Sequence, residues 1–282
     1  MKTCCRTCRL RLSFSEASKG FTYAKPTPAP SGLASVSVTL GIPPGAGRRS
    51  VLIANPNSNP STTDVLVDRL SRWMTVFASG VDIPAVLGVT AKQGPEMITT
   101  PQALTDAARH VCEVVGDAVD RHRLDAVVVG AFGDPGVEHL RGRLDIPVIG
   151  IGEAAVRDAS RSATRFGIAT TTGDLVQQLV QMVDSHALAD VFTGVEVTDT
   201  GPLRLAAQPD ESLLELADAV QRACSRGAEK VIIGGGPLSS ASDNLEQLFP
   251  GVIVDPVNAA ARWAEQVTRP RHLQHQDEKA LG

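Results

Sequence analysis

The sequence has few aromatic residues, no long apolar run and no excess of positive charge. Phe, Trp and Tyr make up 4% of the 282 residues, and the formal net charge is −4. A membrane-spanning helix needs about 18 or more consecutive apolar residues, and no such run occurs. The charge balance gives no basic surface for nucleic acid or for an anionic membrane. We therefore expect a cytoplasmic protein with a small-molecule ligand and with neither nucleic acid nor membrane as a partner.

The first 49 residues are poor in acidic residues and rich in Ser, Thr and Pro. Their only acid is Glu16. A transit peptide has such a composition, but the Pro-rich middle opposes one long helix, and no apolar segment for secretion is present. We expect residues 1–49 to be a disordered extension or the product of a misassigned start codon.

Cysteine and histidine give little support for disulfides or a metal site. Cys4, Cys5 and Cys8 lie in the extension, which leaves only Cys112 and Cys224 in the body of the chain. The spacing of Cys5 and Cys8 fits half a zinc site, but no second pair follows in the extension. The histidines show neither HxxxH spacing nor a nearby serine motif, so a catalytic triad or a bound metal is not expected.

From residue 50 onward, short β-branched runs alternate with longer segments of helical periodicity. This alternation is typical of βαβ units, so it predicts an α/β fold with parallel sheets. Strands are expected at residues 51–54, 85–89, 126–130, 148–151, 166–169, 191–197, 230–234 and 252–255. Helices are expected at residues 62–77, 101–120, 173–184 and 211–226, and a polar tail from Arg262.

The chain also repeats itself in outline. The segment I-P-V-I-G-I-G-E-A-A at 146–155 has a counterpart in V-I-V-D-P-V-N-A-A at 252–260, and a strand with a Gly-rich turn precedes each. Two lobes are expected, at 50–164 and 165–268, with a C-terminal helix that packs across them and a flexible tail at 269–282. Because parallel sheets bind ligands beyond the carboxyl ends of their strands, the two turns should line one cleft.

The turn A-N-P-N-S-N after the first strand has two interpretations. Asn55 and Ser58 would help to bind a carboxylate or oxyanion together with free N–H groups at the following helix start. Asn, Pro and Ser also serve ordinary turns and N-caps. The spacing alone does not choose between them.

The Gly-rich turns differ in what they indicate. In Gly130-Ala-Phe-Gly-Asp-Pro-Gly136, the backbone N–H groups around Phe132 and Gly133 could approach an anion, but Asp134 could equally be a turn residue or cap. In Gly234-Gly-Gly-Pro-Leu-Ser-Ser240, three consecutive glycines favour close approach of a ligand, because a structural loop need not lose so much backbone entropy.

Three further side chains near predicted strand ends are candidates. Thr170 and Thr171 could bond a carboxylate or ureide, and helix capping before Asp174 is the alternative. Glu153 would act as an acid or base if burial raised its pKa.

Seven segments, in this order, resemble the aspartate/glutamate racemase superfamily over residues 50–268, and within it the hydantoin/allantoin racemase branch. They read V-L-I-A-N-P-N-S, G-P-E-M-I, D-A-V-V-V-G-A-F-G-D-P-G, I-P-V-I-G-I-G-E-A-A, F-G-I-A-T-T, A-E-K-V-I-I-G-G-G-P-L and V-I-V-D-P-V-N-A-A. The resemblance implies two pseudo-symmetric lobes, each a small parallel sheet flanked by helices. It also implies a small carboxylate, hydantoin or ureide between the lobes, no cofactor or metal, and a homo-oligomer.

By this resemblance the reaction is a racemisation in which two cysteines act on opposite faces of a carbon acid. Their positions fall on Ala131 and Gly236, which cannot carry a proton. The substrate contacts implied are Asn55, Ser58, Phe132, Gly133, Thr170, Thr171, Gly235, Pro237 and Leu238.

Loss of the thiols leaves the reaction open. Ser239, Asp134 or Glu153 would have to supply the acid, base or nucleophile of an altered isomerase. The alternatives are a related lyase or hydrolase that uses the same oxyanion-stabilising cleft, or a catalytically silent ligand-binding homologue.

Overall fold

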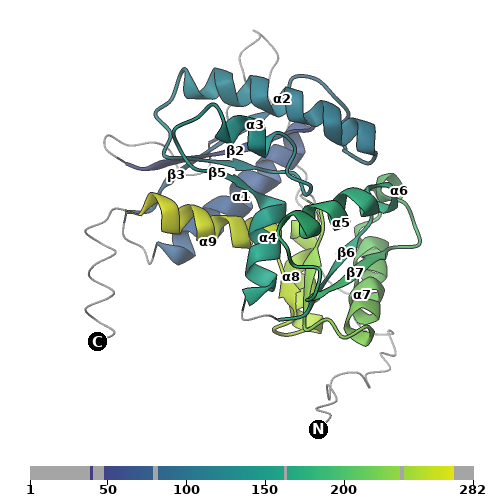
Figure 1. Ribbon diagram of the computed structural model, residues 1–282. Helices are drawn as coiled ribbons and strands as arrows, with labels where there is room; N and C mark the ends of the chain where they lie inside the picture. Colours follow the sequence, from purple (N-terminus) through teal and green to yellow (C-terminus); the bar gives the residue numbers. More distant parts are fainter. Residues whose placement is uncertain (1–38, 41–47, 79–81, 162–163, 236–237, 270–282) are drawn as a thin grey trace, which may run out of the picture. The chain divides into compact units, whose positions relative to one another are not determined.

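The computed structural model describes residues 39–40, 48–78, 82–161, 164–235 and 238–269 (Figure 1). The first half contains β1 (Thr39–Leu40), β2 (Ser50–Asn55), α1 (Pro60–Phe77), β3 (Ala85–Thr90), α2 (Pro101–Val119), β4 (Ala126–Val129), α3 (Val137–Arg141), β5 (Val148–Gly150) and α4 (Ile151–Ala159). The second contains β6 (Phe166–Thr170), the 3-10 helix η2 (Gly173–Leu175), α5 (Val176–Ser185), β7 (Phe192–Val197), α6 (Pro202–Ala206), α7 (Pro209–Ser225), β8 (Lys230–Ile233), α8 (Ser239–Leu248), β9 (Ile253–Val254) and α9 (Pro256–Thr268).

The strands form two separate sheets, one in each half. Their orders are β1-β3-β2-β4-β5 and β7-β6-β8-β9. All pairings are parallel except that of β1 with β3. Sequential strands therefore need helical crossovers, as the alternating pattern predicts. The predicted two-lobed α/β fold is confirmed.

Both sheets are covered on both faces, so their central strands are continuous apolar runs. Helices α1 and α9 contact one face of the first sheet and α2 and α3 the other, while α4 and α5 contact one face of the second sheet and α7 and α8 the other. The largest core cluster combines residues of both halves, among them Ile53, Val128, Ile168 and Ile232. The two lobes thus share one hydrophobic core.

The helices that end each half exchange lobes. Helix α4 follows β5 but contacts β8, β9 and α5, and α9 follows β9 but contacts α1, β4 and β5. They contact each other between the sheets (Figure 1), and both carry small buried residues, including Ala155 and Ala260, which allow helix backbones to approach closely. The guanidinium of Arg157 on α4 lies 4.7 Å from the ring centroid of Trp263 on α9.

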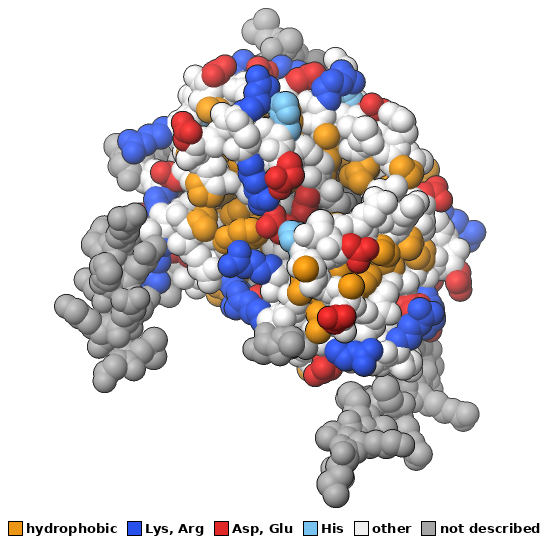
Figure 2. Space-filling view, viewed as in Figure 1, with side chains coloured by type: hydrophobic (Ala, Val, Ile, Leu, Met, Phe, Trp, Pro, Cys, Tyr) orange, Lys and Arg blue, Asp and Glu red, His pale blue; other side chains and the backbone are white. Residues whose placement is uncertain are grey.

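The surface shown in Figure 2 mixes basic and acidic side chains, with hydrophobic patches between them. No broad field of one charge covers this face. Among the described residues, no helix combines the length and apolar character needed to cross a bilayer.

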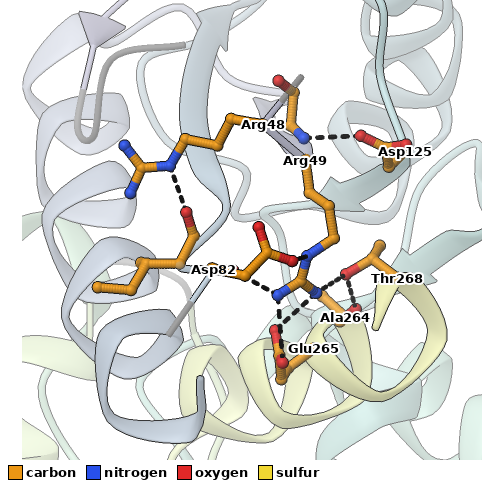
Figure 3. Close-up of polar contacts among 9 residues, drawn as sticks. Arg48, Arg49, Asp82, Asp125, Ala264, Glu265 and Thr268 are labelled. Carbon is orange, nitrogen blue, oxygen red and sulfur yellow. Dashed lines mark hydrogen bonds and ion pairs between the residues drawn. The ribbon is translucent and has the colours of Figure 1, made fainter. Parts of the chain in front are cut away.

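The predicted extension needs a correction at its end, because its last residues belong to the fold. Strand β1 pairs with β3, and Arg49 is only 8% exposed. Its guanidinium donates to Asp82 Oδ2 at 2.9 Å, and to Glu265 Oε2 and Thr268 Oγ1 at 3.0 Å each (Figure 3). These bonds tie the start of β2 to the end of α9. Residues 1–38 and 41–47 lie outside the described residues.

The predicted polar tail also begins later than expected. Helix α9 continues from Arg262 to Thr268, with Ala264 fully buried and Glu265 5% exposed. The Arg262 guanidinium lies 4.7 Å from the Phe77 ring centroid. The partners of these polar residues come from distant parts of the chain, so the local composition did not reveal their burial.

Candidate functional site

The two glycine turns, residues 130–136 and 234–240, start at matching places in the two sheets. The N–H of Gly130 donates to Ala54 O at 2.8 Å, and that of Gly234 donates to Ala169 O at 2.8 Å. These bonds follow equivalent strand pairings, of β2 with β4 and of β6 with β8. The register therefore equates Ala131 with Gly235.

This equivalence bears on the second predicted cysteine position. Gly236 and Pro237 lie outside the described residues, and so does the side chain of Ser239. Gly235, one residue before Gly236, is the position that corresponds to Ala131. A Cβ atom at Gly235 would lie 2.9 Å from Leu238 Cδ1, so Leu238 covers this glycine.

The two turns contact each other through Phe132. Its side chain is 7% exposed and belongs to the core shared by both lobes. A Cβ atom on Gly234 would lie 3.2 Å from Phe132 Cε1 and 2.9 Å from Ile168 Cγ2. Any side chain at this position would be crowded. Glycine thus allows the Phe132 ring to pack against the backbone of the second turn.

The first turn presents three consecutive N–H groups, those of Ala131, Phe132 and Gly133, that have no acceptor within the described part of the chain. The N–H of Asp134, in contrast, donates to Ala131 O at 3.1 Å. Gly133 and Asp134 have φ angles of 109° and 50°. Successive N–H groups in such a turn form a concave anion-binding arrangement.

The second turn presents fewer amides among its described residues. The N–H of Gly235 donates to Ile233 O at 3.1 Å, and that of Leu238 donates to Gly235 O at 3.2 Å. The open amides of the described site therefore belong to the first turn.

The turn after β2 uses its amides internally. A cascade of asparagine side chains accepts from N–H groups two residues ahead, each at 3.0 Å: Asn55 from Asn57, Asn57 from Asn59, and Asn59 from Ser61. Asn55 Nδ2 also donates to Asn57 Oδ1 at 2.8 Å and to Thr63 Oγ1 at 3.0 Å. The turn and N-cap interpretation therefore accounts for these side-chain bonds, and the N–H groups of Asn57, Asn59 and Ser61 have acceptors within the segment.

Ser58 holds a neighbouring loop. Its hydroxyl donates to Gly94 O at 2.9 Å and its N–H to Pro95 O at 3.1 Å. Both acceptors are in or beside the G-P-E-M-I segment, so Ser58 fixes that segment to the turn after β2.

Asp134 and Glu153 are both engaged around the start of α4. The Asp134 carboxylate accepts from Gly152 N at 2.8 Å and Glu153 N at 2.6 Å. Burial raises the pKa of Asp134 to about 7, although these two N–H groups act to lower it. Glu153 Oε2 accepts from Arg141 at 2.6 Å, and Arg141 also donates to Val148 O at 2.9 Å. The cap interpretation of Asp134 is thus the one observed.

The two threonines after β6 have different roles. Thr170 is fully buried, and its hydroxyl donates to Gly234 O at 2.7 Å. It also accepts from Thr172 N at 3.2 Å. Thr171 is 5% exposed, and its hydroxyl makes no hydrogen bond within the described residues. Thr170 therefore fixes the second turn, and the hydroxyl of Thr171 has no partner among the described residues.

Two small parallel sheets with matched, touching strand-end turns define a class of two-lobed α/β proteins. The family model described as Asp/Glu/Hydantoin racemase matches residues 51–264. The chain therefore belongs to the Asp/Glu/hydantoin racemase family.

Relatives and solved structures agree with this membership. The hydantoin racemase of Paenarthrobacter aurescens is 27% identical over 218 residues, which cover 77% of this chain and 90% of the relative. The hydantoin racemase of Rhizobium meliloti is 28% identical, with coverage of 76% and 86%. The allantoin racemase structure from Klebsiella pneumoniae has a TM-score of 0.69 at 24% identity, covering 78% of this chain and 87% of that one.

Proposed function

We propose that the protein is an isomerase-type enzyme that binds a hydantoin, or another small ureide or carboxylate, at the two glycine turns and stabilises its enolate. The three unpartnered N–H groups of Ala131, Phe132 and Gly133 are the observation that carries this proposal. Family membership and the hydantoin and allantoin racemases among the similar proteins support it.

The chemistry of a carbon acid fits these donors. Removing a proton next to a carbonyl group moves negative charge onto the carbonyl oxygen. Backbone N–H groups aimed at that oxygen stabilise it without reorganisation, and one such donor is worth about 10²–10³ in rate. The hydroxyl of Thr171 supplies a further donor from the second lobe.

Proton transfer must differ from that of a thiol pair. By resemblance, the cysteine positions fall on Ala131 and Gly236, and the strand register favours Gly235 for the second. Two of the three considered replacements, Asp134 and Glu153, are held by α4 amides and by Arg141. This observation favours a second candidate, a ligand-binding homologue without turnover.

Deuterium exchange separates the two candidates. The protein is incubated in D₂O with one enantiomer of 5-methylhydantoin or of allantoin, and the α-proton signal is followed by NMR against a protein-free control. Exchange faster than the control supports the isomerase. Thermal stabilisation by the compound without exchange supports the binding protein, and the absence of both contradicts the proposed function.

Placing cysteines in both turns tests which residue of the second turn, Gly235 or Gly236, is equivalent to Ala131. We expect Ala131→Cys with Gly235→Cys to give racemisation, and Ala131→Cys with Gly236→Cys to give less. Leu238 has to move to admit the new side chain at 235. Serine at the same positions is the matched control, because it has similar volume without a thiol. Racemisation only with cysteine at 236 would reject the equivalence of Ala131 with Gly235.

Cofactor independence, a cytoplasmic location and assembly into a homo-oligomer form part of the same proposal. Light scattering on the purified protein measures the oligomeric state. Activity after exhaustive dialysis against a chelator checks independence from cofactor and metal.

A further inference from the structure

Asp134 joins the open amides of the first turn to a helix of the other lobe. Its backbone immediately follows Ala131, Phe132 and Gly133, and its carboxylate accepts from the first turn of α4. Helix α4 in turn packs on β8, β9 and α5. A single side chain thus connects the proposed oxyanion site with the second lobe.

The surrounding sequence makes room for this carboxylate. A Cβ atom on Gly150 would lie 2.1 Å from Asp134 Cγ, and one on Gly152 would lie 3.0 Å from Asp134 Oδ2. The I-G-I-G segment therefore has glycine at the two places where a side chain would displace Asp134. Asp134 itself has a left-handed φ of 50°, a conformation that costs a non-glycine residue energy.

Helix α9, which takes the equivalent place in the second half, is capped by its own N-cap residue and not by a side chain from a turn. Asp255, the N-cap residue of α9, accepts from Val257 N at 2.8 Å and Asn258 N at 3.3 Å with its own carboxylate. In the repeated segments these two amides correspond to those of Gly152 and Glu153. A local cap is thus possible at this position, yet α4 receives its carboxylate from the first turn.

We propose that Asp134 is a positioning residue of the site: by binding the amides of Gly152 and Glu153, it holds the peptides of residues 131–133 with their N–H groups open to a ligand. The identity of that ligand rests on the proposed function, whereas the statement that Asp134 holds the turn does not depend on it.

Two variants break the contact in different ways. Asp134→Asn places an amide group where two N–H donors need acceptors, and Gly150→Ala pushes the unchanged carboxylate away. Asp255→Asn is the matched control, because it damages the equivalent cap on α9, together with the ion pair to Arg69, without touching the first turn. Hydrogen–deuterium exchange of the N–H of residue 134, measured by NMR without ligand, reports the turn, because this N–H donates to Ala131 O whereas those of residues 131–133 have no acceptor within the described part of the chain.

We expect faster exchange of the N–H of residue 134 in both Asp134→Asn and Gly150→Ala, and wild-type exchange there in Asp255→Asn. Affinity for 5-methylhydantoin, measured by calorimetry, should fall about tenfold or more in the first two variants. Asp255→Asn should lower the melting temperature with little change in affinity. A purely structural role of Asp134 would lower stability and leave affinity unchanged.

Unchanged exchange of the N–H of residue 134 in both variants would overturn the proposal, and so would an equal loss of affinity in Asp255→Asn. If wild-type protein binds neither 5-methylhydantoin nor allantoin, the proposed function fails. The exchange experiment then still decides whether Asp134 holds the turn.

Discussion

Helices α4 and α9 receive a carboxylate at the same two backbone positions, but from different sources. Asp255 caps its own helix and also accepts from Arg69 of α1, in an ion pair whose side chains are each 8% exposed. Asp134 reaches α4 from the first glycine turn. Both helices thus need an acceptor for N–H groups of their first turn, but the acceptor has a different role in each. The carboxylate of Asp255 also binds the lobes together, and that of Asp134 fixes the turn with open amides.

The largest effect should come from removing the cap that binds the lobes. Asp255→Ala leaves Arg69 buried with Asp243 as its one remaining partner among the described residues, and it removes the acceptor of two helix N–H groups. The loss of one member of a buried pair predicts a cost of about 3–5 kcal/mol in urea unfolding. Asp243→Ala is the control, since Asp243 is 40% exposed and should cost much less. Equal losses of unfolding free energy in the two variants would show that the buried pair of Arg69 with Asp255 contributes no more than the exposed pair of Arg69 with Asp243.

The pH dependence of stability should have opposite signs for Asp134 and Asp243. Because burial raises the pKa of folded Asp134 to about 7, its stabilising contribution is present below its ordinary pKa and lost as the pH rises through 7. Asp243 has the opposite shift: although burial acts to raise its pKa, Arg69 and Arg72 lower it overall, so its contribution is lost as the pH falls.

Unfolding free energies measured from pH 4 to pH 8 check both statements. Asp134→Asn should remove the decline toward pH 8, and Asp243→Asn should remove part of the loss toward pH 4. If the unfolding free energy of Asp134→Asn declined toward pH 8 as steeply as that of wild type, the raised pKa of Asp134 would be contradicted.

The end of the first turn should tolerate a side chain poorly. A Cβ atom on Gly136 would lie 2.8 Å from Ala108 O and 2.9 Å from Val111 Cγ1, with φ at 80°. Gly136→Ala should cost about 1–3 kcal/mol in chemical unfolding. Gly142→Ala, with no atom nearer than 3.6 Å to its Cβ, should be close to wild type.

The smallest expected change in stability distinguishes the neighbouring threonines. Thr170→Val leaves Gly234 O without its hydroxyl donor and should cost about 1 kcal/mol. Thr171→Val should leave the melting temperature near that of wild type and weaken binding of 5-methylhydantoin. The reverse pattern, with stability lost at 171 and affinity lost at 170, would exchange their roles.

Much of the fold could be predicted from the sequence, because buried parallel strands are short apolar runs that end in glycine or asparagine turns. The predicted strand at residues 51–54 corresponds to β2, and that at 230–234 to β8, within one or two residues. Strand β1 is too short for a pattern, and no helix was predicted for residues 151–159, where α4 lies, although a C-terminal helix packing across the lobes was expected.

The site was predictable in part, for a different physical reason. The glycine turns are local features, and their positions followed from the strand ends. The choice between ligand contact and turn chemistry at Asn55 depended on the geometry of its side chain. Pairs such as Arg69 with Asp255 and Arg49 with Glu265 are 186 and 216 residues apart in the chain, so no local pattern identifies them.

The exchange of α4 and α9 has a consequence for how the chain can be divided. Severing it between α4 and β6 would give fragments that each carry a helix belonging to the other's hydrophobic interior. Neither fragment should remain folded in isolation, whereas mixing the two should reconstitute the native assembly through mutual completion.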